Sequence, residues 1–282
     1  MSCFKTLPIC EKDSVGVNFL YHTAPGRCIL QLLIRPGVSK ALGAFLDTGL
    51  SRHLVKPFVR ATNLDLSDYP DRPYASFNDF FTRQVKEDRR IIDTDPGALI
   101  APCDGKLTVY PITKETLFDI KHSVYAVKDL LQDTDLAKEF EGGMCLIFRL
   151  TPDDFHRYSF MDQGNVCSTK TIPGVLHTVR PIAFRRYPVF SENAREYAVL
   201  KTENFGKVIQ MEVGALFVGR IVNHPISTFS CGLEKGKFEF GGSTIILLLQ
   251  KDAAVIDPEL LENTRSGLES IVRLGQKIGT KA

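Results

Sequence analysis

The chain has 282 residues, of which 44% are hydrophobic and 24% are charged, and its formal net charge at pH 7 is +2. This balance is typical of a globular protein and excludes a disordered or fibrous chain. The seven cysteines form no C-x-x-C pair and the six histidines no H-x-x-x-H pair. We therefore expect reduced thiols, no metal site built from neighbouring residues and no nucleic-acid partner.

The N-terminal region combines positive charge with apolar residues. Residues 1–60 carry eight Lys or Arg and three Asp or Glu, a net charge of +5. The apolar runs at 17–21, 29–34 and 42–46 are each too short to cross a bilayer, which needs about 20 apolar residues. We expect residues 1–90 to be mainly helical. This region either lies on an anionic membrane surface or packs as a cap on the rest of the protein.

The pattern changes along the chain from helices to strands. A helix is predicted to begin at Ser76, whose hydroxyl can cap the first turn. Asp79, three residues further on, can complete this N-terminal cap. Short apolar runs bounded by Gly, Pro and Asn then predict strands at 98–101, 106–110, 144–150, 197–200, 208–213 and 245–249. Asn204-Phe205-Gly206 suits a hairpin turn between two of them. We expect the tail, residues 258–282, to close the chain as a helix, because its leucines and isoleucines recur at helical spacing.

A serine stands at the mouth of the most apolar of these strands. Gly241-Gly242-Ser243-Thr244 leads into five consecutive branched apolar residues, which suit a strand buried on both faces. The preceding segment, residues 234–237, is interpreted as a solvent-exposed stretch that leads up to the strand. Because glycine has no Cβ, the Ser243 hydroxyl could approach the Gly242 carbonyl, as a self-cleaving chain requires. The alternative is a simple turn or bulge before the strand.

Two other segments carry groups that could activate this serine. Asp104 lies in a Pro-Cys-Asp-Gly turn between two predicted strands, and His156 follows the end of another. A serine hydroxyl becomes a nucleophile when an imidazole takes its proton, and a carboxylate can orient that imidazole. Sequence spacing leaves open whether Asp104, His156 and Ser243 meet, or are a turn aspartate, a structural histidine and a strand serine.

Five motifs together resemble the phosphatidylserine decarboxylases, in the order found in that family. They are SFNDFFTR at 76–83, PCDG at 102–105, DFHR at 154–157, MEVGA with VG at 211–219 and GGST at 241–244. The resemblance covers roughly residues 70–250. It identifies the chain as a member of a family of proenzymes in which a Gly-Ser bond breaks itself.

The resemblance implies a role for each matching residue. Ser243 would be the nucleophile and would later become the pyruvoyl group, which is the only cofactor. Gly242 would be the last residue of the long chain. Asp104 and His156 would be its charge-relay partners. The chain would then consist of a long part, residues 1–242, and a short part, residues 243–282, which are partners in one protein. It would convert phosphatidylserine to phosphatidylethanolamine, with the pyruvoyl carbonyl as the electron sink.

The chain departs from the family pattern at two positions. Many members have a second histidine three residues beyond the first, where this chain has Ser159. His177, in a segment that resembles the family's pocket-forming loop, is the obvious substitute as a contact to substrate or a proton donor. Gly241 stands where many relatives have leucine, which leaves the Gly242-Ser243 bond intact.

The predicted architecture is α+β: an antiparallel β-sheet body, an N-terminal helical region, and the self-cleavage site at the start of a central strand. The predicted division is a helical part, residues 1–90, and a catalytic β-rich part, residues 91–282. We expect a peripheral protein on the cytoplasmic side of a membrane, and leave a homodimer open. Two other functions stay open: a pyruvoyl-dependent decarboxylase of a soluble amino acid, and a Ser-His-Asp hydrolase that does not cleave itself.

Overall fold

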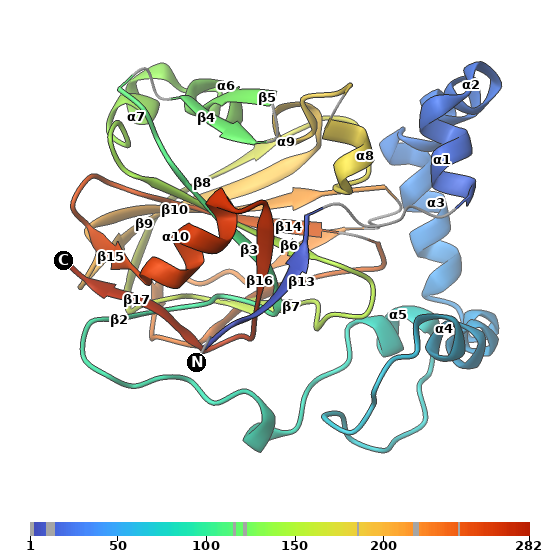
Figure 1. Ribbon diagram of the computed structural model, residues 1–282. Helices are drawn as coiled ribbons and strands as arrows, with labels where there is room; N and C mark the ends of the chain where they lie inside the picture. The colour runs from blue at the N-terminus through green and yellow to red at the C-terminus, as the bar shows by residue number, and fades with distance from the viewer. Residues whose placement is uncertain are drawn as a thin grey trace.

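A large antiparallel sheet forms the body of the protein. The computed structural model describes residues 3–9, 15–114, 117–120, 123–184, 186–216, 220–241 and 243–282. Within these residues, nine strands make up the large sheet, in the order β1 (Lys5–Pro8), β16 (Leu268–Val272), β3 (Gly105–Pro111), β6 (Met144–Leu150), β14 (Ser243–Leu249), β10 (Lys207–Gly214), β9 (Arg195–Thr202), β8 (Gly164–Ile172) and β12 (Thr228–Phe229). The predicted α+β class is confirmed (Figure 1).

Three smaller sheets complete the strands of the described chain. They are β11 (Ile221–Asn223), β13 (Glu234–Phe238) and β7 (Arg157–Ser159); β15 (Ala254–Ile256), β17 (Lys277–Lys281) and β2 (Ala98–Ile100); and β4 (Leu117–Ile120) with β5 (Ser123–Ala126). The hairpin expected at 204–206 is confirmed, because β9 and β10 pair antiparallel on either side of it. Gly206 has φ 67°, in the left-handed region where glycine is favoured.

Most of the helices lie outside the sheet body. Their bounds are α1 (Val15–His22), α2 (Ala24–Leu33), α3 (Pro36–Leu46), η1 (Gly49–Leu54), α4 (Val55–Thr62), α5 (Phe77–Phe81), η2 (Glu87–Arg89), α6 (Val127–Leu131), α7 (Thr134–Lys138), α8 (Pro181–Phe184), α9 (Val189–Glu192) and α10 (Pro258–Arg265). In Figure 1 the elements from α1 to α4 stand along one side of the body. We call them the helical arm, residues 15–62.

The helical arm begins and ends its helices by local rules. The Thr23 hydroxyl accepts a hydrogen bond from the Gly26 N–H at the start of α2, and prolines occupy the first turns of α2 and α3. The predicted cap at Ser76 is confirmed, because its hydroxyl accepts from the Asp79 N–H. No single helix in the described ranges is long and apolar enough to cross a bilayer, although α2 and α3 together, bent by 67°, meet that test by length and composition.

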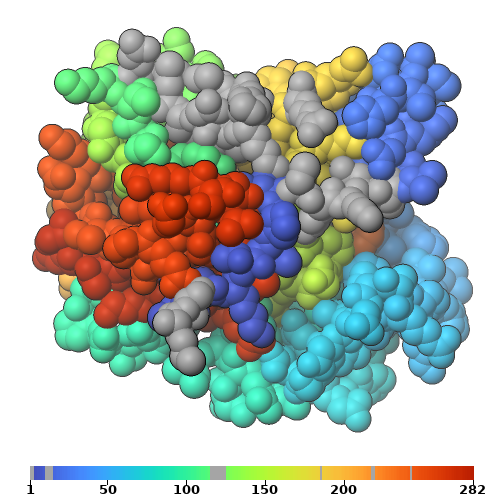
Figure 2. All heavy atoms as spheres, viewed as in Figure 1, coloured from blue at the N-terminus to red at the C-terminus, as the bar shows by residue number. Residues whose placement is uncertain are grey.

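Both ends of the described chain enter the sheets, which the sequence patterns missed. Residues 5–8, in the region expected to be helical, form β1 and pair with β16. Figure 2 shows this N-terminal segment in blue against the C-terminal part in red. The expectation of a helix over the whole tail is wrong beyond α10, because β16 and β17 follow it. Short strands at the end of a chain depend on distant partners, so the helical spacing of a few apolar residues was misleading.

The interpretation of residues 234–237 as a solvent-exposed stretch is also wrong. This segment lies in β13, and Lys235 is only 4% exposed. Its Nζ lies 2.7 Å from Oε2 of Glu212 in β10 and 2.9 Å from Oδ1 of Asn223. Glu212 is fully buried, and burial raises the pKa of its carboxyl group although Lys235 opposes the shift. The ion pair therefore ties the small sheet to the large one in the interior.

Removing one partner of this pair should cost more stability than removing both. We expect Lys235→Met to lower the free energy of unfolding by about 3 kcal/mol, because it leaves a buried carboxylate without a cation. The double variant Glu212→Leu/Lys235→Met should recover most of the loss, since both charges are then gone. Urea unfolding of the two variants, both made in the uncleavable Ser243→Ala chain, measures the difference. Equal losses in both would contradict the assigned pairing.

Candidate active site

Ser243 is the first residue of the central strand β14. It pairs with Leu150 of β6 on one side and Gly214 of β10 on the other. Its side chain is fully buried, and among the described residues its Oγ has no hydrogen-bond partner. A buried hydroxyl is normally bonded, so an unbonded one marks a group available for chemistry. Gly241 has φ 136°, a conformation that residues with a side chain rarely adopt. Gly242, the predicted cleavage partner, lies outside the described residues.

His156 lies between β6 and β7 with its ring completely buried. Its Nδ1 is 2.9 Å from the main-chain oxygen of Asp154, and its ring contacts that of Phe81 with centroids 4.1 Å apart. Because a carbonyl only accepts, Nδ1 carries the proton and Nε2 presents a lone pair. That Nε2 has no partner in the described part of the chain. Burial lowers the pKa of His156 to about 3, so the ring is neutral at pH 7.

Asp104 is held by partners other than His156. Its carboxylate accepts from Arg90, with Nε 2.8 Å from Oδ1 and Nη2 2.6 Å from Oδ2, and from the Leu274 N–H at 2.9 Å. No hydrogen bond joins it to His156 within the described ranges. The orienting contact to the imidazole comes instead from the Asp154 carbonyl. The charge-relay role of Asp104 therefore remains a prediction.

Four supporting residues were not assigned by sequence reasoning: Arg90, Lys106, Thr151 and Asp154. Lys106 places its Nζ 2.9 and 2.7 Å from the two carboxylate oxygens of Asp154, and the Thr151 N–H donates to the same group at 2.6 Å. These contacts hold the backbone that orients His156. Arg90, which neutralises Asp104, lies outside every motif. Asp154 could have been noticed, because it begins the DFHR segment.

The chain is similar to known proteins over most of its length. The family model described as phosphatidylserine decarboxylase matches residues 77–280. The phosphatidylserine decarboxylase proenzyme 2 of Clostridium acetobutylicum is 47% identical over 264 residues, which are 93% of this chain and 91% of that protein. The phosphatidylserine decarboxylase proenzyme of Ruminiclostridium cellulolyticum is 40% identical, and the match covers 93% of this chain and 90% of that protein. The proenzyme of Clostridium perfringens is 39% identical, and the match covers 94% of this chain and 92% of that protein. The chain belongs to the phosphatidylserine decarboxylase family. The predicted resemblance is confirmed.

The pyruvoyl group of this family derives from a serine, which in this chain would be Ser243. Three features suit the conversion of this serine into a pyruvoyl group. Its Oγ is unbonded, Gly241 has a conformation that favours glycine, and the neutral imidazole of His156 has a free Nε2. The residues present therefore fit the group. Where side chains are described, no three of His, Cys, Asp and Glu gather into a set able to hold a metal ion.

Ser159 replaces the second histidine found in many phosphatidylserine decarboxylases, and it lies against the Asp104 turn. Its N–H donates to the Pro102 carbonyl at 2.8 Å, and its Oγ lies 3.4 Å from the same oxygen. Gln210 of β10 donates to the Ser159 carbonyl at 3.1 Å. The position is thus part of the link between the small sheet and the Asp104 turn.

His177 lies in a different environment. Its ring stacks on Tyr187 with centroids 4.0 Å apart, and its Nδ1 is 3.4 Å from the Tyr21 hydroxyl of α1. Burial lowers the pKa of His177 to about 4. Asn193 accepts from the His177 N–H and donates to the carbonyls of His177 and Gly214, the latter at 2.7 Å. Because Gly214 pairs with Ser243, Asn193 links the His177 loop to the end of the reactive strand.

The two buried histidines should make stability fall in mild acid. Both have folded-state pKa values, about 3 and about 4, below the ordinary 6.5, so only the unfolded chain binds these protons as pH falls from about 6.5 to about 4. Stability is then lost as pH falls through this window. Urea unfolding of the Ser243→Ala chain between pH 7 and pH 4 measures the slope. His156→Gln should reduce it.

Proposed function

We infer that this chain cleaves itself between Gly242 and Ser243 and then decarboxylates phosphatidylserine to phosphatidylethanolamine. Its family membership supports the reaction. The single structural observation that carries the site is the buried, unbonded Ser243 hydroxyl at the head of β14. Family membership also favours this function over a hydrolase that stays uncleaved and over a decarboxylase of a soluble amino acid.

In the proposed self-cleavage, His156 acts as the base. Its free Nε2 takes the proton of the Ser243 hydroxyl while Nδ1–H stays bonded to the Asp154 carbonyl. The oxygen attacks the Gly242 carbonyl carbon, and the peptide bond becomes an ester as the amine of residue 243 is released. Elimination then frees the Gly242 carboxylate and leaves dehydroalanine at 243. One water hydrolyses its imine form, releases ammonia and gives the pyruvoyl group.

In the decarboxylation, the loss of carbon dioxide leaves an electron pair on the serine Cα. The pyruvoyl carbonyl supplies the electron sink for it. A protein group must then return a proton to Cα. A protonated His156 would give its proton up readily, because burial disfavours its charged form. We propose His177 as a second proton donor, because Asn193 ties its main chain to Gly214, the pairing partner of Ser243.

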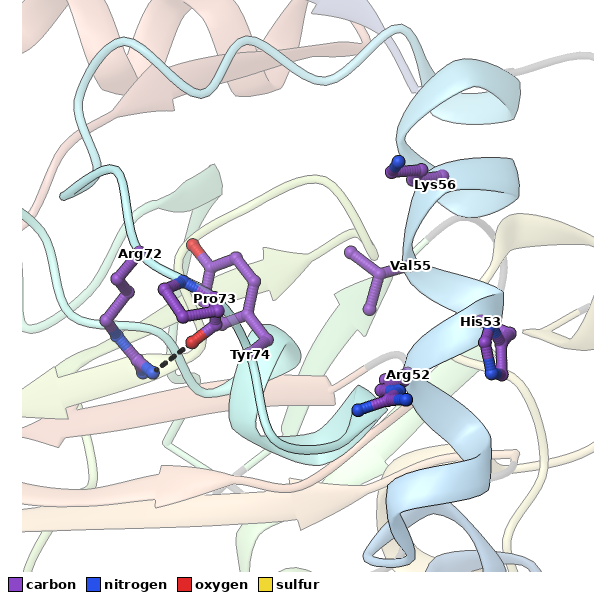
Figure 3. Close-up of a pocket in the computed structure, with 7 residues that line it drawn as sticks. All are labelled: Arg52, His53, Val55, Lys56, Arg72, Pro73 and Tyr74. Carbon is purple, nitrogen blue, oxygen red and sulfur yellow. Dashed lines mark hydrogen bonds between the residues drawn. The ribbon is translucent and has the colours of Figure 1, made fainter.

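The helical arm is the proposed contact with an anionic membrane on the cytoplasmic side. Of the ten large hydrophobic residues exposed in the described chain, seven belong to it: Val15, Phe19, Ile29, Leu32, Phe45, Leu50 and Leu54. Arg52 and Lys56 line a cavity of about 450 Å³ against Pro73 and Tyr74 (Figure 3) and have no anionic partner within the described residues. Apolar side chains beside unpaired cations suit an anionic lipid surface. A homodimer remains a proposal that sedimentation can test.

Processing should yield two chains that stay together. Denaturing mass analysis should find residues 1–242 and a pyruvoyl-capped 40-residue chain, residues 243–282, whereas native gel filtration should keep them in one peak. β14 holds the short chain, since it lies between β6 and β10 of the long one. Ser243→Ala should abolish cleavage, and His156→Ala should slow it by orders of magnitude. Active protein that contains only the intact serine-bearing chain would contradict the proposal.

His177→Ala should separate cleavage from decarboxylation. We expect the 40-residue chain to accumulate normally, because His156 alone serves the first reaction, while the turnover of phosphatidylserine falls at least tenfold through the loss of a proton donor. Mass analysis and product assay on one preparation compare the two activities. Normal turnover would leave His177 as a structural residue of its loop.

A further inference from the structure

A second cavity lies between the helical arm and the end of β10, the strand next to the reactive strand β14. Its volume is about 330 Å³, and Gly214, the pairing partner of Ser243, forms part of its wall. The other walls are largely apolar and include Pro36 of the arm, Ile172 of β8, Ile221 of β11, and Leu176, which lies between β8 and α8. Charged side chains also line it, those of Lys40, Arg195, Glu196 and Arg220, and an apolar cavity with charged groups in its wall suits an amphiphilic small molecule.

The cations that line this cavity differ in what they already bind. Arg195 is buried and donates to main-chain carbonyls of four residues, those of Asp129, Leu130, Ser191 and Asn193. Arg220 pairs with Glu239, Nε to Oε2 at 2.8 Å. Lys40, on α3, also lines the cavity and has no hydrogen bond or ion pair with any residue that the structure describes. Its ammonium group is the cation of this wall that a ligand could use without breaking a protein contact.

We propose that Lys40 binds the phosphodiester of the substrate lipid and thereby selects a phospholipid over free serine. This inference rests on the proposed decarboxylation at Ser243. The serine amine must reach residue 243, beside Gly214 at the inner wall. In the lipid, the phosphodiester lies between the serine and the acyl chains. With the serine beside Gly214, the phosphodiester would lie further out in the same cavity, where Lys40 of the arm forms part of the wall. An ammonium group provides both charge and donors for such an oxyanion.

The connection between the arm and the cavity wall supports this assignment. The Leu176 N–H donates to the Ile34 carbonyl, at the junction of α2 and α3, at 2.9 Å. The Tyr21 hydroxyl of α1 accepts from the Thr178 N–H, also at 2.9 Å. These bonds hold α1 and the junction before α3 against the 173–178 loop. Lys40 therefore lies at a defined place relative to Gly214, although its side chain is exposed.

The test uses a short-chain phosphatidylserine dispersed as monomers, so that attraction to a membrane plays no part. Lys40→Ala should process normally and show a KM raised about tenfold or more, since a hydrogen bond to a charged group contributes about 1.5–3 kcal/mol. Any turnover of free serine should be the same in Lys40→Ala and in the parent. Lys40→Arg should retain most of the affinity. Lys201→Ala, at the far end of β9, is the matched control, because this exposed lysine also lacks a partner in the described chain.

A binding measurement separates the phosphodiester from the carboxylate. The uncleavable Ser243→Ala chain is titrated calorimetrically with short-chain phosphatidylethanolamine, which has the phosphodiester but no carboxylate. Lys40→Ala in that background should weaken binding by about the same factor as it raises KM. A variant that matches the parent in both KM and binding would overturn the inference, as would a loss seen only with phosphatidylserine. A parent enzyme inactive on phosphatidylserine would instead refute the proposed function itself.

Discussion

The burial of β14 between β6 and β10 is the constraint on which the rest of the structure depends. Its seven residues, Ser243 to Leu249, are at most 1% exposed. Because paired strands fix its register, Ser243 is set opposite Leu150 and Gly214. The proposed site is thus placed by a fully buried strand, while His156 and Asp104, the groups proposed to act on Ser243, lie in segments next to β6 and β3.

Those groups depend on buried charges that neutralise one another. Lys106 pairs with Asp154 beneath His156, and Arg90 pairs with Asp104 in the neighbouring turn. Each pair satisfies a carboxylate that burial would otherwise penalise. The imidazole is consequently surrounded by fixed partners and remains neutral, with its reactive nitrogen unbonded. Burial disfavours the charged ring, so a proton that Nε2 takes would be held only briefly and passed on readily.

The elements with strong local patterns could be predicted from the sequence. The apolar runs gave the strands at 144–150, 208–213 and 245–249, and Ser76 gave a helix start. The ordered motifs gave the family and the positions of Ser243 and His156. What failed depends on partners far apart in the chain: β1 and β16 pair across more than 250 residues, and Lys235 is buried because Glu212 meets it. No window of sequence contains both members of such a pair.

The partner choice of Asp104 belongs to the same class. Its carboxylate is bonded to a guanidinium 14 positions earlier and an N–H 170 positions later, and neither carries a motif. Sequence spacing could name the acid, but not the group that it would bind. Its contribution to the chemistry is therefore a matter for experiment, whereas its contribution to holding the turn is visible in these contacts.

The position of β1 beside β16 has a consequence for the processed protein. Cleavage at 242 would leave β1 in one polypeptide and β16 in the other, with β14 likewise flanked by strands of the longer piece. A single cooperative fold would then consist of two polypeptides that had folded as one chain before cleavage. Unfolding would release two independent chains, so the melting temperature would come to depend on protein concentration. Assembly would have to precede the cut, and the sheet would be a structure that the chain can make only once.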